Sequence, residues 1–237
     1  MLIRLARLIS EKGALGTLKY VPKRVLERAR QRQERRYDEL FNVHTSGINQ
    51  LKDLDFDNPH RLNGIRYEGV PIAQFRRILD RLGIRCEDYT FIDYGSGRGR
   101  ALFLAAERPF KRIIGVEFAP MLHEDAVKNI GTYRNPAQRC LNIEAVCVDA
   151  VQYQPPDDPL VCFFYSPFKP PVFDLVLTNF KTVLDARRHP AILIFFGRNP
   201  ESVALFERRW PSTAKLPLPY DPMSRGNHTA WVTRINR

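Results

Sequence analysis

The feature that most constrains this chain is the alternation of short apolar runs with longer amphipathic segments, which starts near residue 70 and continues to residue 210. Runs such as "RIIGVEF" and "AILIFFG" are apolar almost throughout, which is typical of strands buried on both faces of a parallel sheet. Segments such as "PIAQFRRILDRLG" carry apolar residues three and four positions apart, as in a helix with one buried face. The alternation predicts a mostly parallel sheet covered by helices on both faces.

This pattern predicts seven strands, at residues 90–95, 112–118, 143–150, 159–167, 191–197, 213–221 and 228–235. Helices are expected at residues 71–83, 99–109, 121–133, 172–186 and 200–210. The last two strands are joined by the short polar segment "PMSRGN", which leaves no room for a helix, so we expect them to pair as an antiparallel hairpin at the sheet edge. The predicted fold class is therefore α/β, with a helical N-terminal extension.

Residues 1–40 read as a basic helical appendage. They hold eleven Lys or Arg and five Asp or Glu, which supplies +6 of the formal net charge of +11. Such a segment favours contact with anionic surfaces such as phosphates or acidic lipid headgroups. Residues 45–64 are rich in Asn, Asp and Gly and are typical of a linker or an ordered loop. We therefore predict an extension and linker at 1–64 and a main domain at 65–237.

Several classes of protein are disfavoured. The four cysteines form no C-x-x-C pair, so neither a disulfide framework nor a zinc site is indicated. His123, Glu124 and Asp125 are consecutive and point in different directions on a helix, so no metal site is expected. Arg4 and Arg7 interrupt the apolar opening, which excludes a signal peptide or a transmembrane segment. We expect a cytoplasmic protein, or one that lies peripherally on a membrane surface.

The stretch "TFIDYGSGRGR" carries the first functional signal. An apolar strand ends in Asp93 and is followed by Gly95, Gly97 and Gly99 before the next helix. This places bare backbone at the carboxyl edge of a parallel sheet, where open α/β sheets bind ligands. Two interpretations are open at this point: a cradle for a nucleotide-like cofactor, or an ordinary turn rich in glycine.

The spacing separates the candidate cofactors and mechanisms. Counted from Gly95, the sixth position of a G-x-G-x-x-G fingerprint is Arg100, which disfavours a dinucleotide and a nicotinamide oxidoreductase. The stretch lacks the Gly-Lys-Ser/Thr end of a phosphate-binding P-loop. Tyr94 and Arg98 stand where a nucleophile elbow requires glycine, so Ser96 is a poor nucleophile.

What remains is the pattern D-x-G-x-G-x-G followed by Glu117 at the end of the next strand. With these residues the chain resembles the class I S-adenosylmethionine-dependent methyltransferases. "FIDYGSGRGR" is similar to their first motif, Glu117 to their ribose-binding acid, and "VCVDA", which ends at Asp149 and Ala150, to their third-strand motif. The resemblance covers residues 70–237 and implies a Rossmann-like fold that binds S-adenosylmethionine and releases S-adenosylhomocysteine.

The resemblance also implies roles for individual residues. Glu117 is expected to accept both ribose hydroxyls in a bidentate arrangement. Asp93 is expected to orient the glycine loop and face the methionine end, and Asp149 to accept from the adenine amino group. Acidic groups suit a cationic sulfonium ligand. The full set of expected cofactor-binding residues is Asp93, Gly95, Ser96, Gly97, Gly99, Glu117, Phe118, Asp149, Ala150 and Tyr67.

Tyr67 belongs to "RYEG" (66–69), which together with "HTSG" (44–47) is expected to close over the cofactor, as segments before the first strand do in related enzymes. Of the two segments, the one that holds Tyr67 is the stronger candidate.

On the acceptor side, the fourth strand ends in "FFYSPFKPP". This stretch resembles a shortened form of the N-P-P-Y motif of amino-directed methyltransferases, with Lys169 inserted before the next proline. The expected catalytic residues are Tyr165, Ser166, Pro167 and Phe168. An equally open interpretation is that Pro167 ends the strand and Phe168 packs in the core.

The leading functional hypothesis is a methyltransferase that acts on an unidentified acceptor, with a protein amino group or nucleic acid favoured over a small molecule. Methyl transfer requires mainly that the acceptor's lone pair is aligned on the methyl carbon, so a strong general base is not required. The alternative is a catalytically silent module that keeps the fold and docks on RNA or a membrane through residues 1–40.

Overall fold

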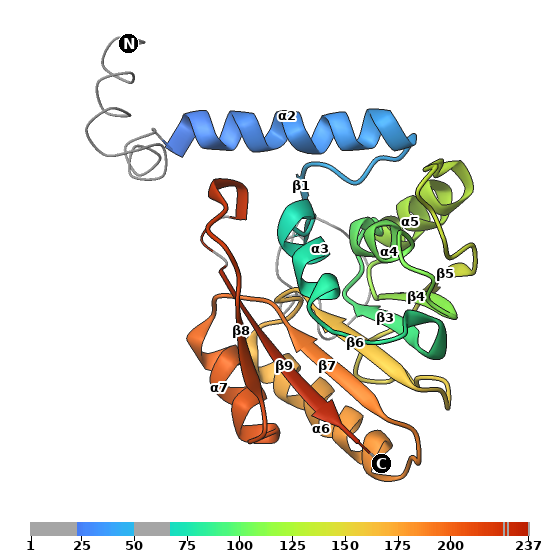
Figure 1. Cartoon of the computed structure of the whole chain (residues 1–237), viewed down its shortest axis with the longest axis vertical. Helices are drawn as coiled ribbons and strands as arrows, with labels where there is room; N and C mark the ends of the chain where they lie inside the picture. Colours follow the sequence, from blue (N-terminus) through green and yellow to red (C-terminus); the bar gives the residue numbers. More distant parts are fainter. Residues whose placement is uncertain (1–22, 50–66, 225, 227, 237) are drawn as a thin grey trace.

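The computed structural model describes residues 23–49, 67–224, 226 and 228–236 (Figure 1). Its main sheet has the strand order β5-β4-β3-β6-β7-β9-β8. The strands are β3 Thr90–Tyr94, β4 Arg112–Glu117, β5 Ile143–Cys147, β6 Leu160–Phe164, β7 Ala191–Phe195, β8 Ala214–Pro217 and β9 Thr229–Ile235. β3 to β7 run parallel, and β9 is antiparallel to its neighbours β7 and β8. The predicted seven-stranded fold with a C-terminal hairpin is confirmed.

Helices cover both faces of this sheet, because residues that alternate along each strand point to opposite sides. Phe91 and Phe163 pack with α3 (Ile72–Asp80) and α4 (Arg100–Ala105). Ile92 and Phe164 pack on the other face with α6 (Pro170–Asp185) and α7 (Pro200–Arg209). α5 (Pro120–Thr132) lies beside β5 and close to α4 (Figure 1).

Several elements are shorter than the sequence predicted. α4 ends at Ala105 instead of 109, and Pro109, which has no backbone N–H, cannot continue it. β6 ends at Phe164 instead of 167, since Ser166 adopts a left-handed conformation with φ of 42° and turns the chain out of the sheet. Short 3-10 helices occur at Cys86–Asp88 (η3) and Pro222–Ser224 (η4).

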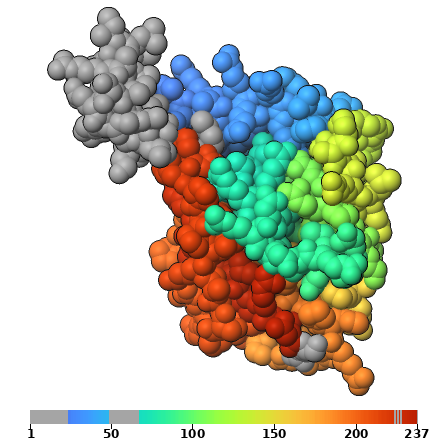
Figure 2. Space-filling model, viewed as in Figure 1, coloured from blue at the N-terminus to red at the C-terminus, as the bar shows by residue number. Residues whose placement is uncertain are grey.

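The N-terminal segment is more than an appendage. α2 (Lys23–Phe41) buries Tyr37 in the same cluster as α3 and α4, and Figure 2 shows this helix lying across one end of the molecule. A short antiparallel pair follows, β1 (Ile48–Asn49) with β2 (Tyr67–Glu68). The helix expected within 1–22 and the linker residues 50–64 lie outside the described residues.

The described ranges contain no helix that is long and apolar enough to cross a membrane. Within the same ranges, no three His, Cys, Asp or Glu side chains are grouped so that they could hold a metal ion. All four cysteines are free thiols.

Candidate cofactor site

The candidate site is a cleft at the carboxyl edge of the sheet, where the chain reverses its direction of travel across the strands. After β3 the chain adds β4 and β5 on one side, and then returns to place β6 on the other side of β3. Ligands of open α/β sheets bind at such a switch point. The cleft is lined by Tyr67, Glu68, Gly95, Gly97, Glu117, Phe118, Leu122, Tyr165, Ser166, Pro167 and Phe168. Segments that follow β3, β4 and β6 therefore meet there.

The glycine loop passes very close to its neighbours. Gly95 and Gly97 have φ of 81° and 52°, which side chains rarely adopt. A Cβ atom on Gly95 would overlap Pro167, and one on Gly97 would overlap the ring of Tyr67. Glycine is required at both positions because the backbone is packed against these two side chains.

Glu117 holds the loop in place. Its carboxylate is 4% exposed and accepts hydrogen bonds from the backbone amides of Gly97 (2.8 Å), Phe118 (3.0 Å) and Ala119 (2.9 Å). Burial raises the pKa of Glu117, and the three amides partly offset that rise. A carboxylate offers about four acceptor positions. One position therefore remains on the oxygen that faces Gly97, so the expected bidentate contact with a ribose requires one amide bond to open.

Asp93 lies beneath the loop and is also buried, at 4% exposure. Burial, together with the nearby Glu117, raises its pKa from 3.8 to about 8. None of the hydrogen bonds among the described residues reaches its carboxyl group. A buried acid without a donor favours its neutral form, and a cationic ligand beside it would favour the charged form.

Tyr67 covers the loop from the N-terminal segment. Its ring lies against Gly97, its hydroxyl donates to the carbonyl oxygen of Thr45 (2.6 Å), and the Arg98 guanidinium lies 5.4 Å from the ring centroid. Arg98 also donates to the carbonyl oxygen of Ser46 (2.9 Å) and to Asp125 (3.0 Å). The segments 44–47 and 66–69 were predicted to cover the cofactor, and their described residues, 44–47 and 67–69, are thus tied directly to the glycine loop.

A second arginine of the glycine motif fastens α2 to the core. Arg100 is 2% exposed, donates to the hydroxyl of Thr45, and lies 3.5 Å from the Asp38 carboxylate. Asp38 in turn accepts from the Thr45 amide (2.8 Å), the Thr45 hydroxyl (2.7 Å) and the Ser46 amide (2.6 Å). Sequence reasoning missed this role. The helix dipole disfavours a cation at the first residue of a helix, so Arg100 at this position indicates that a compensating carboxylate lies nearby.

The acceptor-side stretch divides into residues with different surroundings. Pro167 packs over Gly95, and Tyr165 stacks on Phe196 with ring centroids 5.6 Å apart. Phe168 is 6% exposed and joins the cluster under α6, although it also lines the cleft. The side chain of Ser166 packs against Gly197, where a Cβ would overlap its oxygen. Ser166 and Phe168 therefore have clear packing roles, and the catalytic role of the stretch remains a prediction.

Other predicted residues lie near the cleft without lining it: Asp93, Ser96, Gly99, Asp149 and Ala150. The Ser96 hydroxyl packs over Gly115 of β4 and, among the described residues, has no hydrogen-bond partner. Asp149 accepts a hydrogen bond from the amide of Val151 (2.9 Å). The expected cofactor roles of these residues stay predictions. Glu68 and Leu122 line the cleft and were missed, although Glu68 belongs to the flagged "RYEG".

The chemical groups of this cleft match S-adenosylmethionine, but the volume of the cleft is smaller than that ligand requires. Two buried acids suit a ligand with a sulfonium, an ammonium and ribose hydroxyls. The cleft has a volume of about 50 Å³, however, whereas pockets for small molecules hold on the order of 300 Å³ or more. Tyr67, or the stretch that carries Pro167, must therefore move before a ligand of that size can bind.

Comparison with known proteins finds likeness in structure only. No protein-family model matches the chain, and no curated protein is a significant sequence match. The fold is similar to that of an RNA methyltransferase from Salinibacter ruber solved with S-adenosyl-L-homocysteine, at 19% identity and a TM-score of 0.49 over 71% of this chain and 94% of the other. A putative RNA methyltransferase from Pyrococcus horikoshii gives 15% identity and a TM-score of 0.47 over 79% and 92%.

A TehB-like methyltransferase from Corynebacterium glutamicum gives 14% identity and a TM-score of 0.44 over 69% of this chain and 87% of the other. Such values concern the fold alone. The chain's own strand order, its glycine loop after β3 and its C-terminal hairpin define the class I methyltransferase fold.

Proposed function

We propose that this protein is an S-adenosylmethionine-dependent methyltransferase. The observation that carries the proposal is the pair of buried carboxyl groups, Asp93 and Glu117, at the ends of adjacent strands on either side of the glycine loop. Taking two acids out of water without a cation is costly. A ligand that brings positive charge and hydroxyl donors to this edge of the sheet would relieve that cost.

Individual residues then have separate tasks. Glu117 would accept a ribose hydroxyl while it keeps the loop in position through Gly97. Asp93 would become ionised beside the ligand's positive charge. Tyr67 would exclude water above the loop. When bound, S-adenosylmethionine supplies an electrophilic methyl group, and the segment 165–168 would align the acceptor's lone pair with it.

For the acceptor, we favour a protein amino group or a nucleic acid over a small molecule. The net charge of +11 supports an anionic partner. The class of acceptor can be read by incubating the protein with radiolabelled S-adenosylmethionine and a cell extract, which is then divided into protease-treated, nuclease-treated and dialysed portions. The treatment that removes the label identifies the class.

Calorimetry with S-adenosylhomocysteine tests the cofactor. We expect the wild type to bind it and Glu117→Gln to bind at least about tenfold more weakly, because a hydrogen bond to a charged group contributes roughly 1.5–3 kcal/mol. Glu124→Gln is the control, since Glu124 is an exposed acid on neighbouring α5. The proposal fails if the folded wild type does not bind, or if the Glu117 and Glu124 variants bind equally well.

The small volume of the cleft supports one alternative, a catalytically silent module that uses the fold to dock on RNA or on an anionic membrane. Such a module would bind RNA or vesicles in a salt-sensitive way and transfer no methyl group to any extract fraction. Deleting residues 1–22 should weaken that binding, because it removes four of the eleven Lys and Arg of residues 1–40, whereas a longer deletion would also remove Tyr37 and Asp38 from the folded core. Methyl transfer in any fraction excludes this alternative.

A further inference from the structure

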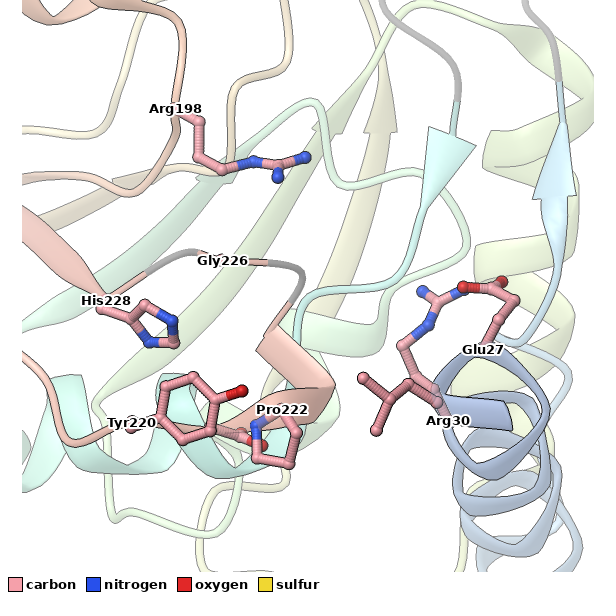
Figure 3. Close-up of a pocket in the computed structure, with 9 residues that line it drawn as sticks. Glu27, Arg30, Arg198, Tyr220, Pro222, Gly226 and His228 are labelled. Carbon is pink, nitrogen blue, oxygen red and sulfur yellow. The ribbon is translucent and has the colours of Figure 1, made fainter. Parts of the chain in front are cut away.

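A second and larger cavity lies at the same edge of the sheet, between α2 and the segment that joins β8 to β9 (Figure 3). Its volume is about 400 Å³, which falls within the ~300–1,000 Å³ typical of small-molecule sites. Arg198 follows β7, and His228 directly precedes β9, whose antiparallel pairing brings its start beside the end of β7. The cavity therefore opens on the side of the sheet where the candidate cofactor cleft also lies.

An ion pair forms part of the wall between the two cavities. Arg30 of α2 lines the larger cavity, Glu68 of β2 lines the cofactor cleft, and their side chains lie 3.5 Å apart. A ligand in the larger cavity would thus lie next to the cleft, separated from it by this pair of side chains.

One side of the cavity offers aromatic rings. Tyr220 is 46% exposed, and its ring centroid lies 5.1 Å from that of His228 with an interplanar angle of 34°. The segment is held in place by Gln74 of α3, which donates to the carbonyl oxygen of Pro219 (2.9 Å). The hydroxyl oxygen of Ser224 lies 3.4 Å from the ring nitrogen Nδ1 of His228. A fixed and exposed ring pair of this kind suits the stacking of a flat ligand ring.

The other sides offer hydrogen-bond donors. Arg198 is exposed, and its side chain reaches inward above Tyr220 and His228, opposite Arg30 (Figure 3). Arg30 is 5% exposed and is paired with Glu27, with Glu34 (3.3 Å) and with Glu68 (3.5 Å). Arg198 is therefore the more exposed guanidinium of the lining, and it is the one that suits the anionic group of a ligand.

Two carboxylates also line the cavity: Asp221, and Glu27, which is paired with Arg30. The lining therefore suits a ligand that combines an anionic group, a flat ring and hydrogen-bond donors. A nucleotide has all three: a phosphate for a guanidinium, a base to stack on Tyr220, and hydroxyl or amino groups for the carboxylates.

We propose that this cavity binds a nucleotide unit, with its base against Tyr220 and its phosphate at Arg198. The ligand is either a free nucleotide or one residue of a single strand, because both present the same groups. Nucleotide binding stands independently of methyl transfer. If the protein is a methyltransferase, the same cavity would be the place where the acceptor enters; this second interpretation rests on the proposed function.

The test uses the full chain and two probes, adenosine monophosphate and a short labelled single-stranded oligoribonucleotide, in direct titrations. We expect Tyr220→Ala to weaken binding by about tenfold, since it removes the ring on which the base stacks. Tyr220→Phe keeps the ring and should bind within about twofold of the wild type. Arg198→Ala should also weaken binding by about tenfold, because it removes a charge-assisted contact.

Arg188→Ala is the matched control for Arg198→Ala, since Arg188 is an exposed arginine at the opposite end of β7. Binding of the mononucleotide with these losses identifies a free nucleotide, and binding of the oligonucleotide alone identifies a strand; both results support the proposal. It is overturned if neither probe binds, or if Tyr220→Ala and Arg198→Ala lose no more affinity than their controls.

A parallel titration with S-adenosylhomocysteine separates the two proposals. If S-adenosylhomocysteine does not bind but a nucleotide does, the proposed function fails and the assignment of the cavity stands. Retained cofactor binding without nucleotide binding overturns the assignment alone.

Discussion

The guanidinium of Arg100 lies 3.5 Å from the carboxylate of Asp38, and both side chains are almost completely buried. Arg100 is the first residue of the helix that follows the glycine loop, and Asp38 belongs to α2. Arg100 also lies over the ring of Tyr37, with its central carbon 5.0 Å from the ring centroid. The glycine motif is thereby connected to the N-terminal segment as well as to the cleft.

The first prediction concerns this ion pair. Asp38→Ala should lower the free energy of unfolding by about 3–5 kcal/mol, because it leaves the Arg100 charge buried and unpaired. Urea denaturation gives the value, and Glu39→Ala, an exposed neighbour on α2, should change it by less than about 0.5 kcal/mol. Replacing both partners, Asp38→Ala with Arg100→Met, should cost less than the sum of the two single changes. Additive losses would argue against a direct pairing.

A second prediction compares two of the glycines that have positive φ, Gly95 and Gly83. Gly95→Ala would suffer both backbone strain and overlap with Pro167, whereas a Cβ on Gly83 meets nothing within 4 Å. Gly83→Ala should therefore cost only the backbone strain of about 1–2 kcal/mol. Gly95→Ala should cost about 1–3 kcal/mol more, because of the overpacking. Equal losses in thermal or urea unfolding would show that Pro167 does not pack on the loop.

The raised pKa of Asp93 predicts how the free energy of unfolding depends on pH. Its pKa in the folded protein is about 8, against an ordinary value of 3.8, so between these values the folded state binds more protons than the unfolded state. The contribution of Asp93 to the free energy of unfolding is fully present below pH 3.8 and is lost as the pH rises through 8. Over this interval the free energy of unfolding should fall by up to about 1.4 kcal/mol per pH unit from this group.

Asp93→Asn should flatten that slope, which urea unfolding at a series of pH values would reveal. Asp88→Asn, an exposed acid before β3, is the control. If the slope between pH 5 and 8 is the same in the wild type and in Asp93→Asn, the assignment to Asp93 is wrong.

Tyr67 predicts the kinetics of ligand entry. Its ring lies over Gly97 in a cleft of about 50 Å³, so we expect it to move when a cofactor binds. Tyr67→Ala should speed the association of S-adenosylhomocysteine in stopped-flow measurements, and dissociation should accelerate as well because water can reach the site. Tyr67→Phe retains the ring and loses the hydrogen bond to Thr45, so its rates should lie between those of wild type and Tyr67→Ala. An unchanged association rate in Tyr67→Ala would mean that ligand enters by another path.

The sequence by itself determined the sheet and the position of the glycine loop. Continuous apolar runs and period-3.6 patterns reflect local burial, so segments such as "RIIGVEF" and "PIAQFRRILDRLG" predicted their elements directly. Asp93, Gly95, Gly97 and Glu117 were predicted to be neighbours because the carboxyl ends of adjacent parallel strands meet at one edge. Element ends were less accurate, as at α4 and β6, because they depend on single prolines and on left-handed residues.

Only the tertiary structure decided what lies over that edge. Contacts between residues far apart in the chain, such as Arg100 with Asp38 or Arg30 with Glu68, leave no periodic trace in the sequence. The same is true of the cavity at Tyr220, which exists because α2 lies across the end of the sheet. Local patterns specify elements, since burial of one face depends on nearby residues. Sites formed between elements depend on packing over long sequence distances, which the tertiary fold alone establishes.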